Sequence, residues 1–307
     1  MSSYAFWTAI WQGLLSAIMA LGVYVSFRVI RFPDLTCDGT YPLGAAVASV
    51  LILQGINPYT ATIAALLAGS SAGMLTGILN TRFRIPAIVS SILVMTGLYS
   101  VNLLIMQKPI LSLSKEDTVF APIYSLQSDG PVFMSGFDIS LLLIPVCFLA
   151  VIVLLKLLLD WLLSTNFGVS LRIAGSNPRL ASSLSINPNM MTLTGLAIGN
   201  GLIALSGALF AQAQRFSDVN LGFGMVVVGL ASVFIAEGIE TQFSNKATIP
   251  IATALVVIGS VIYKLAVAMA YEAGLKAEYF NLLTSGIVFL SLLIPSIRRE
   301  IGQLIRR

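Results

Sequence analysis

The chain has 307 residues, of which 57% are hydrophobic and 10% are charged, and its formal net charge is +4. An average soluble domain carries about 25% charged residues, and a soluble protein of this length could not bury so much apolar surface in one core. The composition therefore excludes an ordinary soluble protein and indicates a membrane protein. The positive charge does not indicate a nucleic acid partner, because the basic residues stand between apolar runs, where they orient a protein in the membrane.

The apolar segments predict a bundle of about nine transmembrane helices, since a spanning helix needs about 20 apolar residues. The predicted spans are 6–27, 40–56, 58–80, 86–106, 139–160, 190–213, 223–240, 248–270 and 281–297. The second is short, and counts of eight or ten remain open. The first has no basic region before it, so we expect a membrane span and not a cleaved signal peptide. The predicted fold class is all-α, a polytopic integral membrane protein in which residues 1–307 form one transmembrane domain.

Lysine and arginine are divided unequally between the loops. One set of loops holds Arg28, Arg31, Arg82, Arg84, Arg172, Arg179, Lys246, Arg298, Arg299, Arg306 and Arg307. The other set holds Lys108, Lys115, Arg215 and Lys276. Because basic residues accumulate on the cytoplasmic side, we expect the N-terminus outside and the C-terminus inside. A polar insert at 167–189 is then cytoplasmic, and the outside segment 107–138 is expected to be a surface loop or short helix.

Two segments of the chain resemble each other. "RFPDLTCDGTYPLGAAVAS" begins at Arg31, and "RFSDVNLGFGMVVVGLAS" begins at Arg215. With one extra residue allowed, the matched glycines are Gly39 with Gly224 and Gly44 with Gly229. Since the first copy is predicted inside and the second outside, the pattern predicts an inverted-topology repeat with short or broken helices along the pathway. Chance similarity is the alternative.

Closely spaced glycines occur in two of the predicted spans. They are Gly69, Gly73 and Gly77 in the first, and Gly195, Gly199, Gly201 and Gly207 in the second. Such spacing lets helices approach closely in lipid. It fits packing within the chain, with a subunit contact as the alternative.

The sequence shows no sign of catalysis. It has no histidine, and its two isolated cysteines, Cys37 and Cys147, predict neither a disulfide framework nor a metal site. A phosphate-binding loop and the zinc-protease and serine-hydrolase motifs are missing as well. We therefore expect no catalytic residue and no metal ligand. If ATP hydrolysis drives this protein, another chain must hydrolyse the ATP.

Charged residues inside the predicted spans are few. They are Lys156, Asp160, Glu237, Glu240 and Lys264, and all are placed toward span ends. Lys156 and Asp160 stand four residues apart on one helix face, where they can pair or extend their charged groups to the membrane surface. No carboxylate stands clearly at a span centre, which disfavours a proton-driven or sodium-driven carrier.

Asp34, Asp38 and Asp218 each precede a short apolar helix. Aspartate is a preferred N-cap residue, so helix capping is one interpretation. The other is that these helix starts line a solute pathway, where free N–H groups face a polar solute.

The polar insert at 167–189 contains the stretch "SLRIAGSNPRLASSLSINP". Asn177 and Pro178 predict the start of a short helix with Leu180 and Leu184 among small residues, and Asn189 is expected to cap the next membrane helix. The insert is then either a helix that docks into a groove of another protein or an ordinary interfacial loop.

The insert and the helix after it resemble the coupling-loop region of bacterial ABC-importer permeases, in the branched-chain amino acid, ribose and nucleoside permease family. The family pattern is matched by Gly168, Arg172, Gly175, Asn177, Ala181, Ile186, Gly201, Ala204 and Gly207. Ser185 stands where the family commonly has glycine. "FPDLTCDGTYPLGA" also resembles a family segment, and "VGLASVFIAEG" resembles the branch described as tryptophan/tyrosine-type. The resemblance covers most of the chain and is strongest over 167–240.

The resemblance implies a permease that pairs with a second permease copy, two cytoplasmic ATPases and an extracytoplasmic solute-binding protein in a bacterial inner membrane. ATP and Mg would be bound by the ATPases, with no cofactor on this chain. The residues implied in ATPase coupling are Gly168, Arg172, Gly175, Asn177, Pro178, Arg179, Ala181 and Ile186. The weaker candidates for the pathway are Asp34, Thr36, Asp38, Asp218 and Asn220.

The leading interpretation is an ABC-importer permease for a small solute, an amino acid by its branch resemblance. Nucleosides and sugars remain open as solutes, as does the choice between a homodimer and a heterodimer. A stand-alone secondary carrier would need a carboxylate at the membrane centre. A membrane-embedded enzyme or scaffold would need a cluster of catalytic polar residues, and none is visible.

Overall fold

The computed structural model describes residues 3–121, 139–243, 248–274, 279, 282–287 and 289. Most of the predicted span 281–297 and the basic residues Lys246, Lys276, Arg298, Arg299, Arg306 and Arg307 lie outside these residues. The helices are α1 (Ser3–Tyr24), α2 (Cys37–Leu53), α3 (Pro58–Thr81), α4 (Ala87–Met106), α6 (Ile139–Ser164), α7 (Asn166–Ser176), α8 (Pro178–Ser183), α9 (Pro188–Gln214), α10 (Met225–Phe243) and α11 (Ile249–Glu272). Shorter elements are the π-helical turn η1 (Val25–Val29), the 3₁₀ turn η2 (Val219–Gly222) and the strands β1 (Ile110–Ser112) and β2 (Phe216–Asp218).

The predicted all-helical membrane architecture is confirmed in its coarse form. Six helices of the described chain are long and apolar enough to cross a membrane, and a seventh span results if α6 and α7, bent by 75°, count as one. α2 is apolar but has only 17 residues. It begins at Cys37 and ends at Leu53, three residues earlier at each end than the predicted span 40–56. The expected count of nine therefore stays a prediction.

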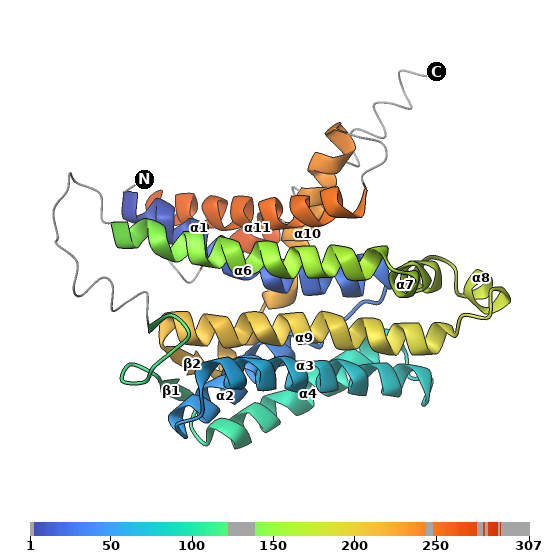
Figure 1. The fold of residues 1–307 in the computed structure, drawn as a ribbon, viewed down its shortest axis with the longest axis horizontal. Helices are drawn as coiled ribbons and strands as arrows, with labels where there is room; N and C mark the ends of the chain where they lie inside the picture. Colours follow the sequence, from blue (N-terminus) through green and yellow to red (C-terminus); the bar gives the residue numbers. More distant parts are fainter. Residues whose placement is uncertain are drawn as a thin grey trace.

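The long helix α9 lies at the centre of the bundle, with α3 and α2 on one side and α1 on the other (Figure 1). Its contact with α3 depends on small residues. A Cβ atom on Gly73 would lie 2.2 Å from the Leu196 carbonyl oxygen, and one on Gly69 would lie 2.3 Å from the Ala204 Cβ. These glycines therefore serve packing within the chain, as one of the two interpretations expected.

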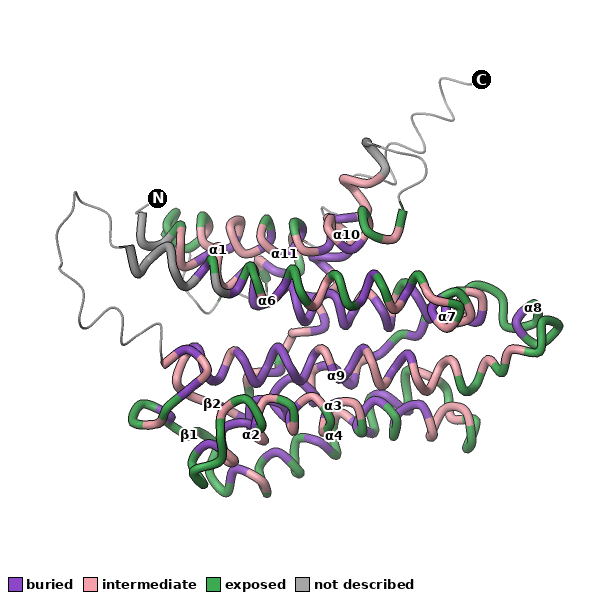
Figure 2. Tube along the Cα trace, viewed as in Figure 1, coloured by how far each residue is buried: buried purple, intermediate pink, exposed green. Residues whose placement is uncertain are grey.

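The outer faces of the bundle expose large apolar side chains, while α9 is mostly buried (Figure 2). Leu67 on α3 is 61% exposed, Leu104 on α4 is 77% exposed, and Trp161 on α6 is 68% exposed. In a soluble protein such faces would be aggregation sites, whereas lipid contact suits them.

α1 and α9 are each followed by a sharp change of direction. Arg31 and Arg215 both have a positive φ, at 53° and 58°. Three residues later, Asp34 Oδ1 accepts the Thr36 N–H and Asp218 Oδ1 accepts the Asn220 N–H. The two segments that resemble each other in sequence thus share a left-handed arginine and an aspartate turn.

The segment after α4 contributes a strand that the sequence did not predict. β1 pairs antiparallel with β2, with Ile110 opposite Asp218 and Ser112 opposite Phe216. The pairing joins two parts of the chain more than 100 residues apart at the end of the bundle away from α8 (Figure 1). The expected loop or short helix over 107–138 is therefore wrong for 110–112, while 122–138 lie outside the described residues.

Candidate functional site

The helix α8 projects beyond the ends of the neighbouring long helices, and α7 connects it to α6 (Figure 1). Each begins at a side-chain cap. Thr165 Oγ1 accepts the Gly168 N–H at 3.3 Å, and Asn177 Oδ1 accepts the Leu180 N–H at 3.1 Å. The predicted short helix at Asn177-Pro178 is thus confirmed.

The cap of α9 differs from the prediction. Asn187 Oδ1, and not the Asn189 side chain, accepts the N–H groups of Asn189 and Met190, at 3.0 and 3.3 Å. The reason is that Pro188 occupies the first helical position, which suits proline because no N–H is needed there. The connection between α8 and α9 therefore comprises residues 184–187.

Apart from Arg172, the residues implied in ATPase coupling divide into a buried or half-buried set and an exposed set. Gly168 and Gly175 pack tightly, since a Cβ on them would lie 2.4 Å from the Leu162 oxygen and 2.2 Å from the Val29 oxygen. Ala181 is fully buried and Ile186 is half-buried. These four residues hold α7 and α8 in place.

The exposed set lies on or next to α8. It comprises Asn177, Pro178 and Arg179, with Leu180 and Leu184 beside them at 47% and 54% exposure. An arginine next to two exposed leucines on a projecting helix forms a compact surface with charged and apolar parts.

Ser185 closes the turn after α8 with a φ of 59°. The Ile186 N–H donates to the Ala181 oxygen at 2.9 Å, which completes the turn. The tight turn is therefore present although serine stands where glycine is common, and serine adopts a backbone conformation that favours glycine.

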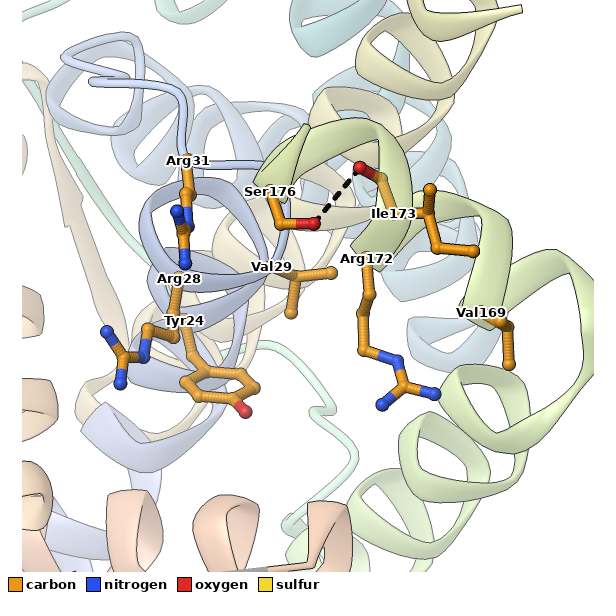
Figure 3. Close-up of a pocket in the computed structure, with 8 residues that line it drawn as sticks. All are labelled: Tyr24, Arg28, Val29, Arg31, Val169, Arg172, Ile173 and Ser176. Atoms are coloured by element: carbon orange, nitrogen blue, oxygen red, sulfur yellow. Dashed lines mark hydrogen bonds between the residues drawn. The ribbon is translucent and has the colours of Figure 1, made fainter. Parts of the chain in front are cut away.

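Arg172 is directed to a different place from Arg179. A cavity of about 400 Å³ between the end of α1 and α7 is lined by Tyr24, Arg28, Arg31 and Arg172 among others, and Figure 3 shows these side chains. Arg28 Nε lies 3.1 Å from Glu237 Oε1 on α10. Arg172 lines this cavity and also a smaller one shared with Glu237 and Glu240 of α10, so it is not part of the exposed surface on α8.

Two of the pathway candidates, Asp34 and Thr36, are buried in a polar network. Asn200 Nδ2 donates to Asp34 Oδ2 at 2.7 Å, and Thr40 Oγ1 lies 2.8 Å from Asn200 Oδ1. Thr36 Oγ1 lies 2.8 Å from Thr76 Oγ1. All five residues are at most 1% exposed, so the network joins α2, α3 and α9 and offers no surface to a solute. The sequence did not predict a role for Asn200, because a single asparagine in an apolar run forms no pattern with other polar residues.

Asp38 does not cap its own helix. Its carboxylate accepts the N–H groups of Gly224 and Val226, at 3.3 and 2.7 Å, and so caps the start of α10. The expected capping of the α2 start by Asp34 and Asp38 is therefore wrong in detail, since Asp34 instead closes the turn before α2. The capping role of Asp218 is confirmed for η2, and Asn220 beside it is exposed.

A second cavity, of about 280 Å³, lies between α2, α4 and the start of α10. Its lining comprises Asp38, Gly39, Pro42, Met95, Thr96, Tyr99, Asn102, Val219 and Phe223. Asp38 is the one pathway candidate from the sequence that reaches it. The α4 residues were missed because their common wall arises from tertiary packing and has no sequence signature.

The expected pairing of Lys156 with Asp160 is confirmed. The two side chains form an ion pair on α6, and Thr253 on α11 donates to Asp160 Oδ1 at 2.6 Å. The hydrogen bond from Thr253 to Asp160 joins α11 to α6, which is a structural role.

A family model described as branched-chain amino acid transport system / permease component matches residues 6–293. The tyrosine transport system permease protein of Clostridioides difficile is 39% identical over 277 residues, which cover 90% of this chain and 86% of that protein. An uncharacterized protein of Rickettsia prowazekii, RP368, is 32% identical over 293 residues, covering 95% and 98% of the two chains.

More distant relatives include the autoinducer 2 import system permease protein LsrC of Salmonella typhimurium, which is 27% identical over 218 residues, covering 70% of this chain and 57% of that protein. No solved structure matches.

Proposed function

Because the chain belongs to the family of branched-chain amino acid transport permeases, we propose that it is the permease subunit of an ABC importer for an amino acid. The 39% identity to a tyrosine permease supports an amino acid over a nucleoside or a sugar. The permease would work in the bacterial cytoplasmic membrane beside a second permease copy, in a homodimer or in a heterodimer with a related permease. A separate binding protein would deliver the solute, and separate ATPase subunits would bind ATP and Mg.

The observation that carries this proposal is the projecting surface of α8. Arg179, Leu180 and Leu184 are exposed there, while Gly175 and Ala181 anchor the segment to the bundle. A short helix that presents apolar anchors and a charge suits a groove on a partner protein. We assign α8 as the coupling helix that enters an ATPase groove, with α7 passing movement to the end of α1.

The same proposal includes the orientation and the inverted repeat. The end that carries α8 also holds Arg28, Arg82 and Arg172, which supports a cytoplasmic position for this end and an outside position for the start of α1. The matched turns at Arg31 and Arg215 support a repeat whose half-helices are α2 and α10.

The first test is affinity purification of the permease from native membranes in a mild detergent, followed by mass spectrometry. An ATPase should co-purify with the wild-type permease. Arg179→Glu should reduce its recovery by about tenfold or more, because a reversed charge at an interface costs at least about 1.4 kcal/mol.

The matched control is Lys108→Glu, which reverses an exposed charge at the opposite end of the bundle. It should leave ATPase recovery unchanged. If Arg179→Glu and Lys108→Glu behave alike, α8 is not the coupling helix. If no ATPase is recovered and membrane vesicles take up solute without ATP, the protein is a secondary carrier instead.

A further inference from the structure

The cavity between α2, α4 and the start of α10 has features that packing alone does not explain. Its volume of about 280 Å³ lies near the lower end of the range of small-molecule sites, about 300–1,000 Å³. The geometry points to a binding site for the transported solute, an amino acid with an aromatic or large apolar side chain. This inference rests on the proposed function and names the residues and the solute class for it.

The first observation is an unsatisfied amide oxygen. Asn102 is fully buried, and its Nδ2 donates to the Gly39 oxygen at 3.1 Å. Its Oδ1 has no hydrogen-bond partner among the described residues. Buried polar atoms are nearly always paired, and Asn102 is one of the residues that line the cavity, so a small side-chain rotation would let this acceptor meet a ligand that brings a donor. An ammonium group supplies such a donor.

The second observation is the sign of the charge. Asp38 lines the cavity, whose described lining contains no lysine or arginine. Its carboxylate already accepts the N–H groups of Gly224 and Val226, but a carboxylate offers about four acceptor positions. The cavity therefore favours a cationic group over an anionic one.

The third observation is the apolar wall. Tyr99 and Phe223 line the cavity and remain 45% and 70% exposed, and Met95 lies beside them. Aromatic rings favour stacked or edge contacts with another ring, and the methionine adapts to irregular shapes. An aromatic amino acid fits this cavity, because its ammonium group can lie near the Asp38 carboxylate and its side chain can pack against the apolar wall.

Other occupants fit less well. A lipid acyl chain has no donor for Asn102, and the carboxylate of Asp38 repels an anionic headgroup. A second copy of the chain could cover Phe223, and the test below distinguishes that occupant from a solute.

The test measures occupancy directly by cysteine labelling. Thr96 is exposed and lines the cavity, so Thr96→Cys places a reactive thiol there with little change in volume. Cys37 is buried and Cys147→Ser removes the other native thiol. The full permease, assembled with its ATPase in proteoliposomes, is treated with a small thiol reagent with and without L-tyrosine.

L-tyrosine should slow the labelling of Thr96→Cys by about tenfold at ten times its dissociation constant, because protection follows one plus the ratio of ligand to that constant. D-ribose should give no protection. The control Tyr59→Cys, at a 59% exposed position outside the cavity, should label at one rate throughout. Equal labelling of Thr96→Cys with and without L-tyrosine would overturn the inference, as would an intersubunit disulfide through Thr96→Cys that L-tyrosine does not affect.

A second measurement compares transport by variants. Phe223→Ala and Tyr99→Ala remove exposed rings and leave the core intact. Each should lower the rate of L-tyrosine uptake by about threefold to tenfold, the equivalent of one aromatic contact. Phe83→Ala and Tyr59→Ala, which truncate similarly exposed rings elsewhere, should not.

Different experimental results would contradict the inference and the proposed function. If the wild-type complex shows no ATP-dependent uptake of any amino acid, the proposed function fails. If it takes up L-tyrosine while the cavity variants and their controls behave alike, the function stands and the site lies elsewhere.

Discussion

The hydrogen bond between Asn200 and Asp34 should be one of the strongest single contributions to the stability of this protein. In Asn200→Ala, Asp34 Oδ2 loses the donor that now lies at 2.7 Å. Leaving a buried acceptor without its donor costs about 1–3 kcal/mol, and the smaller side chain leaves a cavity that costs about 1 kcal/mol. Thr40 loses little, because its hydroxyl can donate to the Thr36 oxygen, 2.9 Å away. The expected destabilisation is about 3 kcal/mol in total.

The assay is thermal unfolding of the purified protein in detergent, followed by intrinsic fluorescence. A loss of about 3 kcal/mol should lower the Tm by about 6 °C in a chain of this size. Asn220→Ala is the control, because its side chain is exposed and such changes usually stay within about 0.5 kcal/mol.

A double-mutant cycle distinguishes the energy of the Asn200–Asp34 contact from the other effects of each substitution. Asp34→Ala should also destabilise the protein, and Asp34→Ala with Asn200→Ala should cost less than the sum, by at least about 1 kcal/mol. A Tm within about 1 °C of wild type for Asn200→Ala, or full additivity of the two changes, would refute the structural role of this pair.

Two further predictions concern backbone conformation and close packing. Ser185→Gly should stabilise the protein by up to about 1 kcal/mol, because Ser185 has a φ of 59°, and a rise in Tm measures it; an unchanged or lower Tm would show that the turn carries no strain. Gly73→Ala should sharply reduce the yield of monodisperse protein in gel filtration, because the added Cβ would lie 2.2 Å from the Leu196 oxygen. Gly97→Ala, where a Cβ would meet nothing within 4 Å, is the matched control, and equal yields for both would contradict the described packing.

Features that depend on local sequence could be predicted. Apolar runs of about 20 residues located the long helices, because a membrane span is set by length and composition. Asn177-Pro178 located the start of α8, because a cap and the first helical turn involve adjacent residues. The resemblance over 167–240 identified the permease family, which the comparisons confirm.

Features that depend on distant partners could not be predicted. The pairing of β1 with β2 involves three residues on each side, too few to give an alternating pattern. Asp38 caps α10 across 186 residues of chain, whereas sequence reasoning assigned it to its own helix. Asn102 and Asn200 are single polar residues in apolar runs, so their roles follow from what packs against them.

Because Asp38 lies on α2 and caps α10, the free energy of this cap depends on the position of both helices. If α10 shifts while both N–H bonds persist, the first turn of α2 must shift with it. If the bonds break, two N–H groups and a carboxylate must find other partners. A solute ammonium bound at the same carboxylate would alter the strength of this cap, and by linkage the state of the cap would alter solute affinity to the same degree. Solute occupancy and the position of α10 relative to α2 would then both depend on the Asp38 carboxylate.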